Sequence, residues 1–193
     1  MALLEVKNLV KNYGDVEALK GINLKVEKGE VVVILGPSGC GKSTFLRCLN
    51  GLENIKSGQL QLQGVGELGK DISWVKARQR IGMVFQSYEL FAHLSVIDNI
   101  LLGPLKVQKR QRAEAEQQAD ELLKRVGLFD RKNAYPRELS GGQKQRIAIV
   151  RSLCMNPYRF YGQRTNYRTI QTGGFLHQSN NGSGKNLPKH SQL

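Results

Sequence analysis

The stretch VVVILGPSGCGKS, residues 31–43, decides the fold of this chain. Its first five residues, 31–35, are all apolar and mostly β-branched, which is typical of a central strand covered on both faces in a parallel α/β sheet. Residues 36–43 fit the pattern G-x-x-x-x-G-K-[ST], and the residues from 42 onward read as a helix. A strand, a glycine-rich loop and a helix in this order predict a phosphate-binding loop (P-loop). An ordinary glycine-rich turn is the alternative, which motif and context together disfavour.

The residue types of the P-loop suit the phosphates of a nucleotide. Glycines let the backbone curl around an anion, and the amides at the helix N-terminus then face it. Lys42 can neutralise the β- and γ-phosphates, and the Ser43 hydroxyl can ligate Mg²⁺, so we expect ATP and Mg²⁺ as cofactors. The predicted nucleotide-binding residues of this segment are Gly36, Pro37, Ser38, Gly39, Cys40, Gly41, Lys42, Ser43 and Thr44.

A second phosphate-binding end is predicted at LSGGQ, residues 139–143, which is followed by the basic and polar residues KQR. A polar cap, two glycines and a helix start present free backbone amides, here at Ser140, Gly141, Gly142 and Gln143. A capped helix without a ligand is the alternative. Two incomplete phosphate sites on one chain predict a head-to-tail dimer.

Hydrophobic periodicity places the remaining elements in a strand-rich N-terminal part and a helical part. Strands are predicted over residues 3–9, 18–26, 57–68 and 81–85, and helices over 95–102, 108–126 and 143–155. The helix that begins at residue 42 should direct Phe45, Leu46 and Leu49 inward. Together these elements predict an α/β fold.

With the P-loop upstream of LSGGQ, the sequence resembles the ATP-binding-cassette (ABC) family over residues 3–157. The resemblance implies a P-loop NTPase fold with an N-terminal antiparallel β-subdomain and an α-helical subdomain over residues 86–150. It implies that Tyr13 stacks on adenine, although packing within the β-subdomain is an equally open role. It also implies that Gln86 touches Mg²⁺ and couples to a transmembrane partner. In this family two copies form a homodimer across two ATP molecules.

Three segments resemble the importers of polar amino acids within this family: LRCLNGLE (46–53), FAHL (91–94) and GPLKV (103–107). This branch implies contact of the helical subdomain with transmembrane permease subunits, and an indirect link to a periplasmic or lipoprotein solute-binding protein. It implies a cytoplasmic location on the inner face of the membrane. A non-transport ABC ATPase acting in DNA repair or translation is the alternative. The short distance from Gln86 to Leu139 argues against the repair type. Residues 88–100 (YELFAHLSVIDNI) resemble the segment that contacts the permease in this family, and they argue against both.

The chain departs from the family pattern after Pro157. By family spacing an Asp and a catalytic Glu should fall near Gln163 and Arg164, yet no carboxylate side chain follows Glu138. We therefore expect no catalytic residue, a hydrolysis-deficient chain and a core that is incomplete at the C-terminus. Residues 1–157 would be a partial ABC domain, and 158–193 an aberrant, disordered tail. A frameshift near Pro157 would explain the tail, and a non-functional remnant is the corresponding alternative.

Bulk composition excludes several other classes of protein. The 193 residues carry a net charge of +13, but residues 139–193 contribute about eight Lys and Arg without one Asp or Glu, so the excess does not predict a nucleic-acid partner. No apolar run approaches the roughly 20 residues of a membrane-spanning helix, and we see no signal peptide. Three cysteines without metal-ligand spacing predict inert thiols in a reducing compartment.

Overall fold

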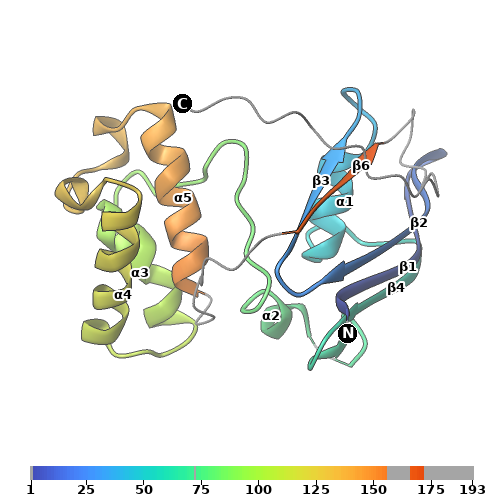
Figure 1. The fold of residues 1–193 in the computed structure, drawn as a ribbon, viewed down its shortest axis with the longest axis horizontal. Helices are drawn as coiled ribbons and strands as arrows, with labels where there is room; N and C mark the ends of the chain where they lie inside the picture. The colour runs from blue at the N-terminus through green and yellow to red at the C-terminus, as the bar shows by residue number, and fades with distance from the viewer. Residues whose placement is uncertain (1, 72, 156–165, 172–193) are drawn as a thin grey trace. The chain divides into compact units, whose positions relative to one another are not determined.

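The computed structural model describes residues 2–71, 73–155 and 166–171 (Figure 1). These residues fall into two compact units. The sheet unit holds residues 2–64 and 166–171, and the helical unit holds residues 65–155.

The sheet unit is built around an antiparallel sheet in which β1 pairs with β2 on one side and with β4 on the other. Its strands are β1 (Ala2–Tyr13), β2 (Val16–Glu27) and β4 (Ser57–Leu62). The two-residue β5 (Gly66–Glu67) lies among the residues of the helical unit. Apolar side chains of β1, β2 and β4 are buried, among them Val6, Leu9, Leu19, Leu24 and Leu60. Val6 and Leu9 are three residues apart because the register of β1 against β2 shifts between them. The pairing of these strands confirms the antiparallel β-rich N-terminal part.

One glycine lets β1 and β4 approach closely. Gly58 has φ +109°, and a Cβ built on it would lie 2.6 Å from the backbone oxygen of Asn8. No other residue fits such a gap without moving the strand, so Gly58 is required by the pairing of the two strands.

The strand that precedes the P-loop is β3 (Glu30–Leu35), which pairs in parallel with β6 (Asn166–Gln171). The expectation that β3 is covered on both faces is wrong. Burial alternates along it, with Val31 and Val33 each 40% exposed and Leu35 46% exposed. A strand packed on one face only shows this pattern, and within the described residues β6 is its one hydrogen-bonded neighbour. The disorder expected for all of 158–193 does not hold for residues 166–171, which form β6; the rest of that segment lies outside the described residues.

Helix α1 (Lys42–Leu49) follows the P-loop, as predicted. It buries Phe45 and Cys48, while Leu46 is 47% exposed, so the inward direction predicted for Leu46 is wrong. Cys48 and Leu49 come three and four residues after Phe45 and therefore share its helical face, from which Leu46 is turned away.

The helical unit packs three long helices around one core (Figure 1). Its helices are α2 (Trp74–Ala77), α3 (Val96–Lys106), α4 (Arg112–Arg125), η1 (Phe129–Arg131), η2 (Pro136–Glu138) and α5 (Gly141–Met155). Helices α3, α4 and α5 confirm the three predicted helices, and Ala115, Ala119 and Leu123 form the buried stripe of α4. Among the described residues no helix combines the length and the apolar character that crossing a membrane requires.

The strand predicted over residues 81–85 is wrong. Ile81, Met83 and Phe85 are half-buried, but the segment has no regular secondary structure. An apolar run becomes a strand only where a neighbouring backbone accepts its hydrogen bonds, and in the described part of the chain no strand pairs with these residues.

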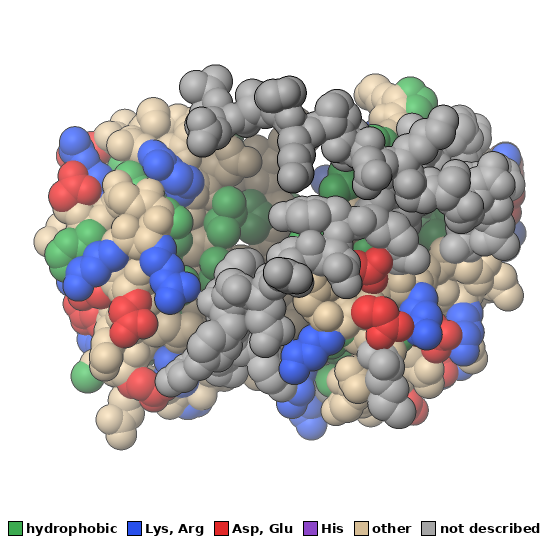
Figure 2. Space-filling model, in the orientation of Figure 1, with side chains coloured by type: hydrophobic (Ala, Val, Ile, Leu, Met, Phe, Trp, Pro, Cys, Tyr) green, Lys and Arg blue, Asp and Glu red, His purple; other side chains and the backbone are tan. Residues whose placement is uncertain are grey.

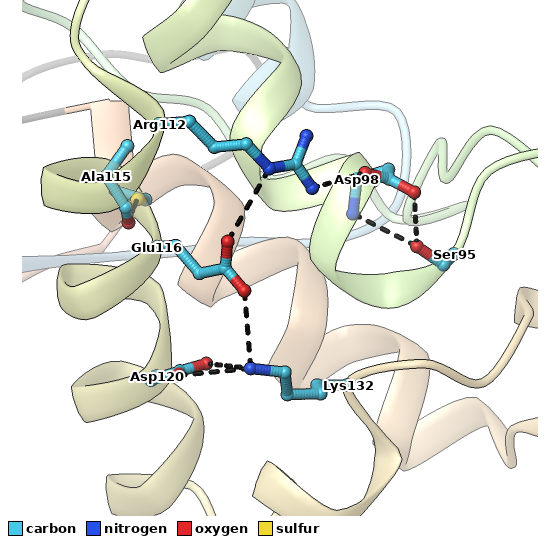
Figure 3. A network of polar contacts seen from close by, with 8 residues as sticks. Ser95, Asp98, Arg112, Ala115, Glu116, Asp120 and Lys132 are labelled. Carbon is cyan, nitrogen blue, oxygen red and sulfur yellow. Dashed lines mark hydrogen bonds and ion pairs between the residues drawn. The ribbon is translucent and has the colours of Figure 1, made fainter.

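Ion pairs join α4 to the start of α3 and to Lys132, the residue after η1 (Figure 3). Arg112 bridges Asp98 (3.3 Å) and Glu116 (3.5 Å). Lys132 bridges Glu116 (3.4 Å) and Asp120 (3.1 Å), and the hydrogen bond from Lys132 to Asp120 raises the pKa of the lysine. On the face shown in Figure 2, basic and acidic side chains are interspersed over the helical unit in the same way. Such partly exposed pairs contribute little to stability.

Candidate phosphate-binding site

The P-loop (residues 36–43) connects β3 to α1 and contains two glycines in left-handed conformations. Gly39 has φ +79° and Gly41 has φ +91°, values that other residues rarely adopt. The Gly41 oxygen accepts a hydrogen bond from the Phe45 amide at 2.8 Å, which opens the first turn of the helix. The glycines therefore curl the loop immediately before the N-terminus of α1, where backbone amides point outward.

Lys42 folds back over its own loop. Its Nζ donates to the backbone oxygens of Gly36 and Pro37, both at 2.7 Å, and lies 3.3 Å from Cys40 Sγ. The ammonium of Lys42 lies beside the N-terminus of a helix and donates to two neutral carbonyl oxygens. It can donate to phosphate oxygens instead, and these bind it more strongly because they are charged. The observed geometry thus fits a phosphate chain.

Three hydroxyl residues lie in the P-loop or directly after it. Ser38 and Ser43 are exposed, and Thr44 is half-buried. The Ser43 hydroxyl in the first turn of α1 is a hard oxygen ligand of the type that Mg²⁺ prefers. Among the described residues there is no group of three or more His, Cys, Asp and Glu side chains that could hold a metal by themselves. Ser43 therefore fits Mg²⁺ as one ligand beside phosphate oxygens.

Tyr13 ends β1 and lies in the sheet unit together with the P-loop. Its side chain is 45% exposed, and Lys11 Nζ lies 4.7 Å from the centroid of its ring. Lys11 also forms an ion pair with Glu53 at 3.1 Å. A ring in this setting is open to stacking by a flat ligand. Sequence reasoning singled out Tyr13 but missed Lys11 and Glu53.

The LSGGQ segment forms a reciprocal cap in the helical unit. The Ser140 amide donates to Gln143 Oε1 at 2.8 Å, and the Gln143 amide donates to Ser140 Oγ at 3.3 Å. This confirms Ser140 as the N-cap of the helix, which begins at Gly141. Gly141 and Gly142 are exposed, and a Cβ built at Gly141 would lie 3.9 Å from the Tyr88 hydroxyl, whereas one at Gly142 would meet open space.

Gln86 is exposed in a turn of the helical unit, and the segment after it is fastened to α5. Tyr88 (φ +63°) and Glu89 (φ +47°) both adopt the left-handed conformation. Arg151 donates to the Glu89 oxygen at 2.7 Å and to the Tyr88 oxygen at 3.1 Å. Burial lowers the pKa of the Arg151 guanidinium. The arginine thereby ties the segment after Gln86 to the helix that carries the LSGGQ glycines. Sequence analysis missed Arg151, because only the folded chain brings it to this loop.

A second residue that sequence analysis missed is Asn99, which is fully buried in α3. Its side chain hydrogen bonds with the backbone of Phe91, Leu94 and Ser95, the loop that resembles the permease-contact segment. The sequence offered a signal for Asn99, because it lies in the mostly apolar run VIDNILL (96–102). A polar side chain on a buried helix face needs hydrogen-bond partners.

The predicted site residues therefore lie in two groups. Tyr13, the P-loop and Thr44 belong to the sheet unit. Gln86 and residues 140–143 belong to the helical unit. Positions 163 and 164, where the family pattern would place its acidic pair, lie outside the described residues.

Comparison with known proteins gives concordant results. The family model described as ABC transporter matches residues 19–159. The arginine transport ATP-binding protein ArtM of Bacillus subtilis (strain 168) is 46% identical over 155 residues, which are 80% of this chain and 65% of ArtM. The glutamate/aspartate import ATP-binding protein GltL of Escherichia coli (strain K12) is 48% identical over 80% of this chain and 64% of GltL. The chain thus spans just under two thirds of the length of these relatives.

A solved structure confirms the fold. The dimeric ATP-binding cassette MJ0796, in a post-hydrolysis state bound to ADP and Pi, superposes with a TM-score of 0.70. The two are 34% identical, over 80% of this chain and 70% of the other. The α/β cassette fold expected from the sequence is therefore shown.

Proposed function

The chain belongs to the ABC transporter family, and from this premise we propose that it is the ATP-binding subunit of a bacterial importer of polar amino acids. The observation that most supports ATP binding is the position of Lys42, whose Nζ donates to the Gly36 and Pro37 oxygens of the P-loop. The amino-acid class rests on the names of the relatives, which transport arginine or glutamate and aspartate.

Each group of residues has a distinct proposed task. Lys42 and the P-loop amides hold the phosphates, Ser43 and Gln86 ligate Mg²⁺, and Tyr13 stacks on the base. Bound Mg²⁺ would neutralise charge on the phosphate oxygens. The Ser140–Gln143 cap presents the amides of α5 to an anion, since a helix N-terminus favours negative charge.

We propose a homodimer in which the LSGGQ segment of one copy closes over the ATP held by the P-loop of the other. The dimeric relative supports this, as do two incomplete phosphate sites on one chain. The segment 88–100 of the helical subdomain, in which Asn99 holds the backbone of residues 91–95, would contact transmembrane permease subunits on the cytoplasmic face of the membrane. The solute-binding protein would act on this chain only through the permease.

Hydrolysis by this chain is proposed to be deficient. In the family pattern a carboxylate near position 164 positions the water that attacks the γ-phosphate, and residues 139–193 contain no Asp or Glu. Loss of such a group typically lowers the rate by about two to four orders of magnitude. In this proposal residues 1–157 are a partial ABC domain, and 158–193 are a segment foreign to the family, as a frameshift would produce.

Binding of a fluorescent ATP analogue to the full chain, with Mg²⁺, tests the proposal. Lys42→Ala should weaken binding about 10- to 100-fold, because it removes a charge-assisted interaction worth about 1.5–3 kcal/mol. Lys28→Ala, at an exposed turn, is the matched control and should change nothing. If the unaltered chain binds no ATP, or Lys42→Ala binds equally well, the nucleotide site is wrong. Release of phosphate from ATP at a rate typical of the family would refute the deficiency alone.

A further inference from the structure

We propose that Lys11 and Glu53 are positioning residues that hold the Tyr13 ring with one face covered, so that a nucleotide base stacks on the opposite face only. The inference rests on the proposed binding of ATP and adds to it two residues that the sequence motifs do not contain.

The three side chains form one connected group. Lys11 Nζ lies 4.7 Å from the Tyr13 ring centroid and 3.1 Å from Glu53 Oε2. A cation within about 6 Å of an aromatic centroid is attracted to the face of the ring. Since Lys11 takes that face, the ring keeps one face for a planar ligand.

The ion pair that holds the lysine is more sheltered than the other pairs of the same sheet. The side chains of Lys11 and Glu53 are 12% and 24% exposed, whereas those of Lys7 and Glu5 are 53% and 35% exposed. Sheltered charges feel less screening by water, so this pair holds its geometry better than an exposed pair does. The hydrogen bond from Lys11 is the largest cause that holds the pKa of Glu53 below its usual value, and the Tyr13 side chain acts in the same direction. Glu53 is linked to the ring through Lys11.

Backbone hydrogen bonds hold the group against the P-loop helix. Glu53 follows the end of α1, where the Leu52 amide donates to the Arg47 oxygen at 2.9 Å. The Lys56 amide donates to the Val10 oxygen at 2.8 Å, one residue before Lys11. The strand that presents Tyr13 and the helix that begins at Lys42 are thus joined within one unit. A base and a phosphate chain bound to this unit would have their separation set by this junction.

Tripolyphosphate separates positioning from general damage, because it has phosphates and no base. Affinities of the full chain for Mg-ATP and Mg-tripolyphosphate are measured by displacement of a fluorescent ATP analogue. Lys11→Met should weaken ATP binding about 5- to 10-fold, since a base on an unrestrained ring loses part of its stacking. Tripolyphosphate affinity should stay within about twofold. Glu53→Gln, which keeps the side-chain shape, should shift the ATP affinity in the same direction.

Two further variants complete the test. Lys11→Arg retains a cation over the ring and should restore most of the ATP affinity. Lys7→Met removes an exposed lysine of the same strand and should leave both affinities unchanged.

The outcomes separate this inference from the proposed function. Unchanged ATP affinity in Lys11→Met, together with a loss in Tyr13→Ala, would overturn the positioning role and leave the base site intact. An equal loss for ATP and tripolyphosphate in Lys11→Met would show a merely structural role and would also overturn it. If Tyr13→Ala leaves the ATP affinity unchanged, both the stacking role of Tyr13 and the positioning role of Lys11 and Glu53 would be refuted. Failure of the unaltered chain to bind either ligand would refute the nucleotide site itself.

Discussion

Replacement of Asn99 by Ala should loosen the loop over residues 91–95 and destabilise the helical unit. The Asn99 side chain is 0% exposed. Its Oδ1 accepts from the Phe91 amide at 2.8 Å, and its Nδ2 lies 3.1, 3.0 and 3.0 Å from the oxygens of Phe91, Leu94 and Ser95. One side chain thus supplies four contacts to a loop that has no regular secondary structure over most of its length.

The size of the effect follows from these contacts. A hydrogen bond contributes about 0.5–1.5 kcal/mol net, and a buried group left without a partner costs about 1–3 kcal/mol. Asn99→Ala removes all four contacts and leaves the Phe91 amide unpaired, so we expect a loss of about 2–4 kcal/mol. Asn99→Asp should cost more, because a carboxylate oxygen would face three carbonyl oxygens.

Urea unfolding and amide hydrogen exchange measure the two consequences. At about 1.4 kcal/mol per tenfold, a local loss of about 3 kcal/mol accelerates exchange of the Phe91 amide about 100-fold. Asn133→Ala, at an exposed asparagine of the same unit, is the matched control. A stability change below about 0.5 kcal/mol with unaltered exchange at Phe91 would refute the reasoning.

Two further predictions concern glycine geometry and thiols. Gly58→Ala should destabilise the sheet unit by about 2–4 kcal/mol in urea unfolding, because its Cβ would lie 2.6 Å from the Asn8 oxygen. Gly64 also has a positive φ but open space around its Cβ position, so Gly64→Ala should cost only about 1 kcal/mol. Equal losses of stability in the two variants would contradict the clash at Gly58. Burial raises the pKa of Cys48 and of Cys154 to about 11, from 9.0, so both thiols should react slowly with a disulfide reagent at pH 8. Because the folded chain keeps these protons while the unfolded chain loses them, their contribution to stability is complete below pH 9 and is lost as pH rises toward 11. The urea midpoint of Cys48→Ala should therefore depend less steeply on pH between 9 and 11 than that of the unaltered chain. An equally steep dependence in the two proteins would contradict this prediction for the sheet unit.

The sequence by itself determined the elements whose rules are local. The P-loop and the LSGGQ cap are readable because left-handed glycines and a Ser-x-x-Gln cap act over a few neighbouring residues. The amphipathic stripe of α4 is readable for the same reason, since Ala115, Ala119 and Leu123 recur at helical spacing. Such patterns specify the helix that begins at residue 42 and the polar cap of α5 without any knowledge of distant residues.

Only the tertiary structure decided which side chains meet across long stretches of chain. Composition predicted strand for residues 31–35 and 81–85 alike, yet only the first has a partner backbone in the described chain, and it is covered on one face rather than two. The Lys11–Glu53 pair and the Arg151 contacts with the loop after Gln86 join segments far apart in sequence. No local pattern specifies such contacts, because a side chain acquires its partners only when the chain folds and removes both from water.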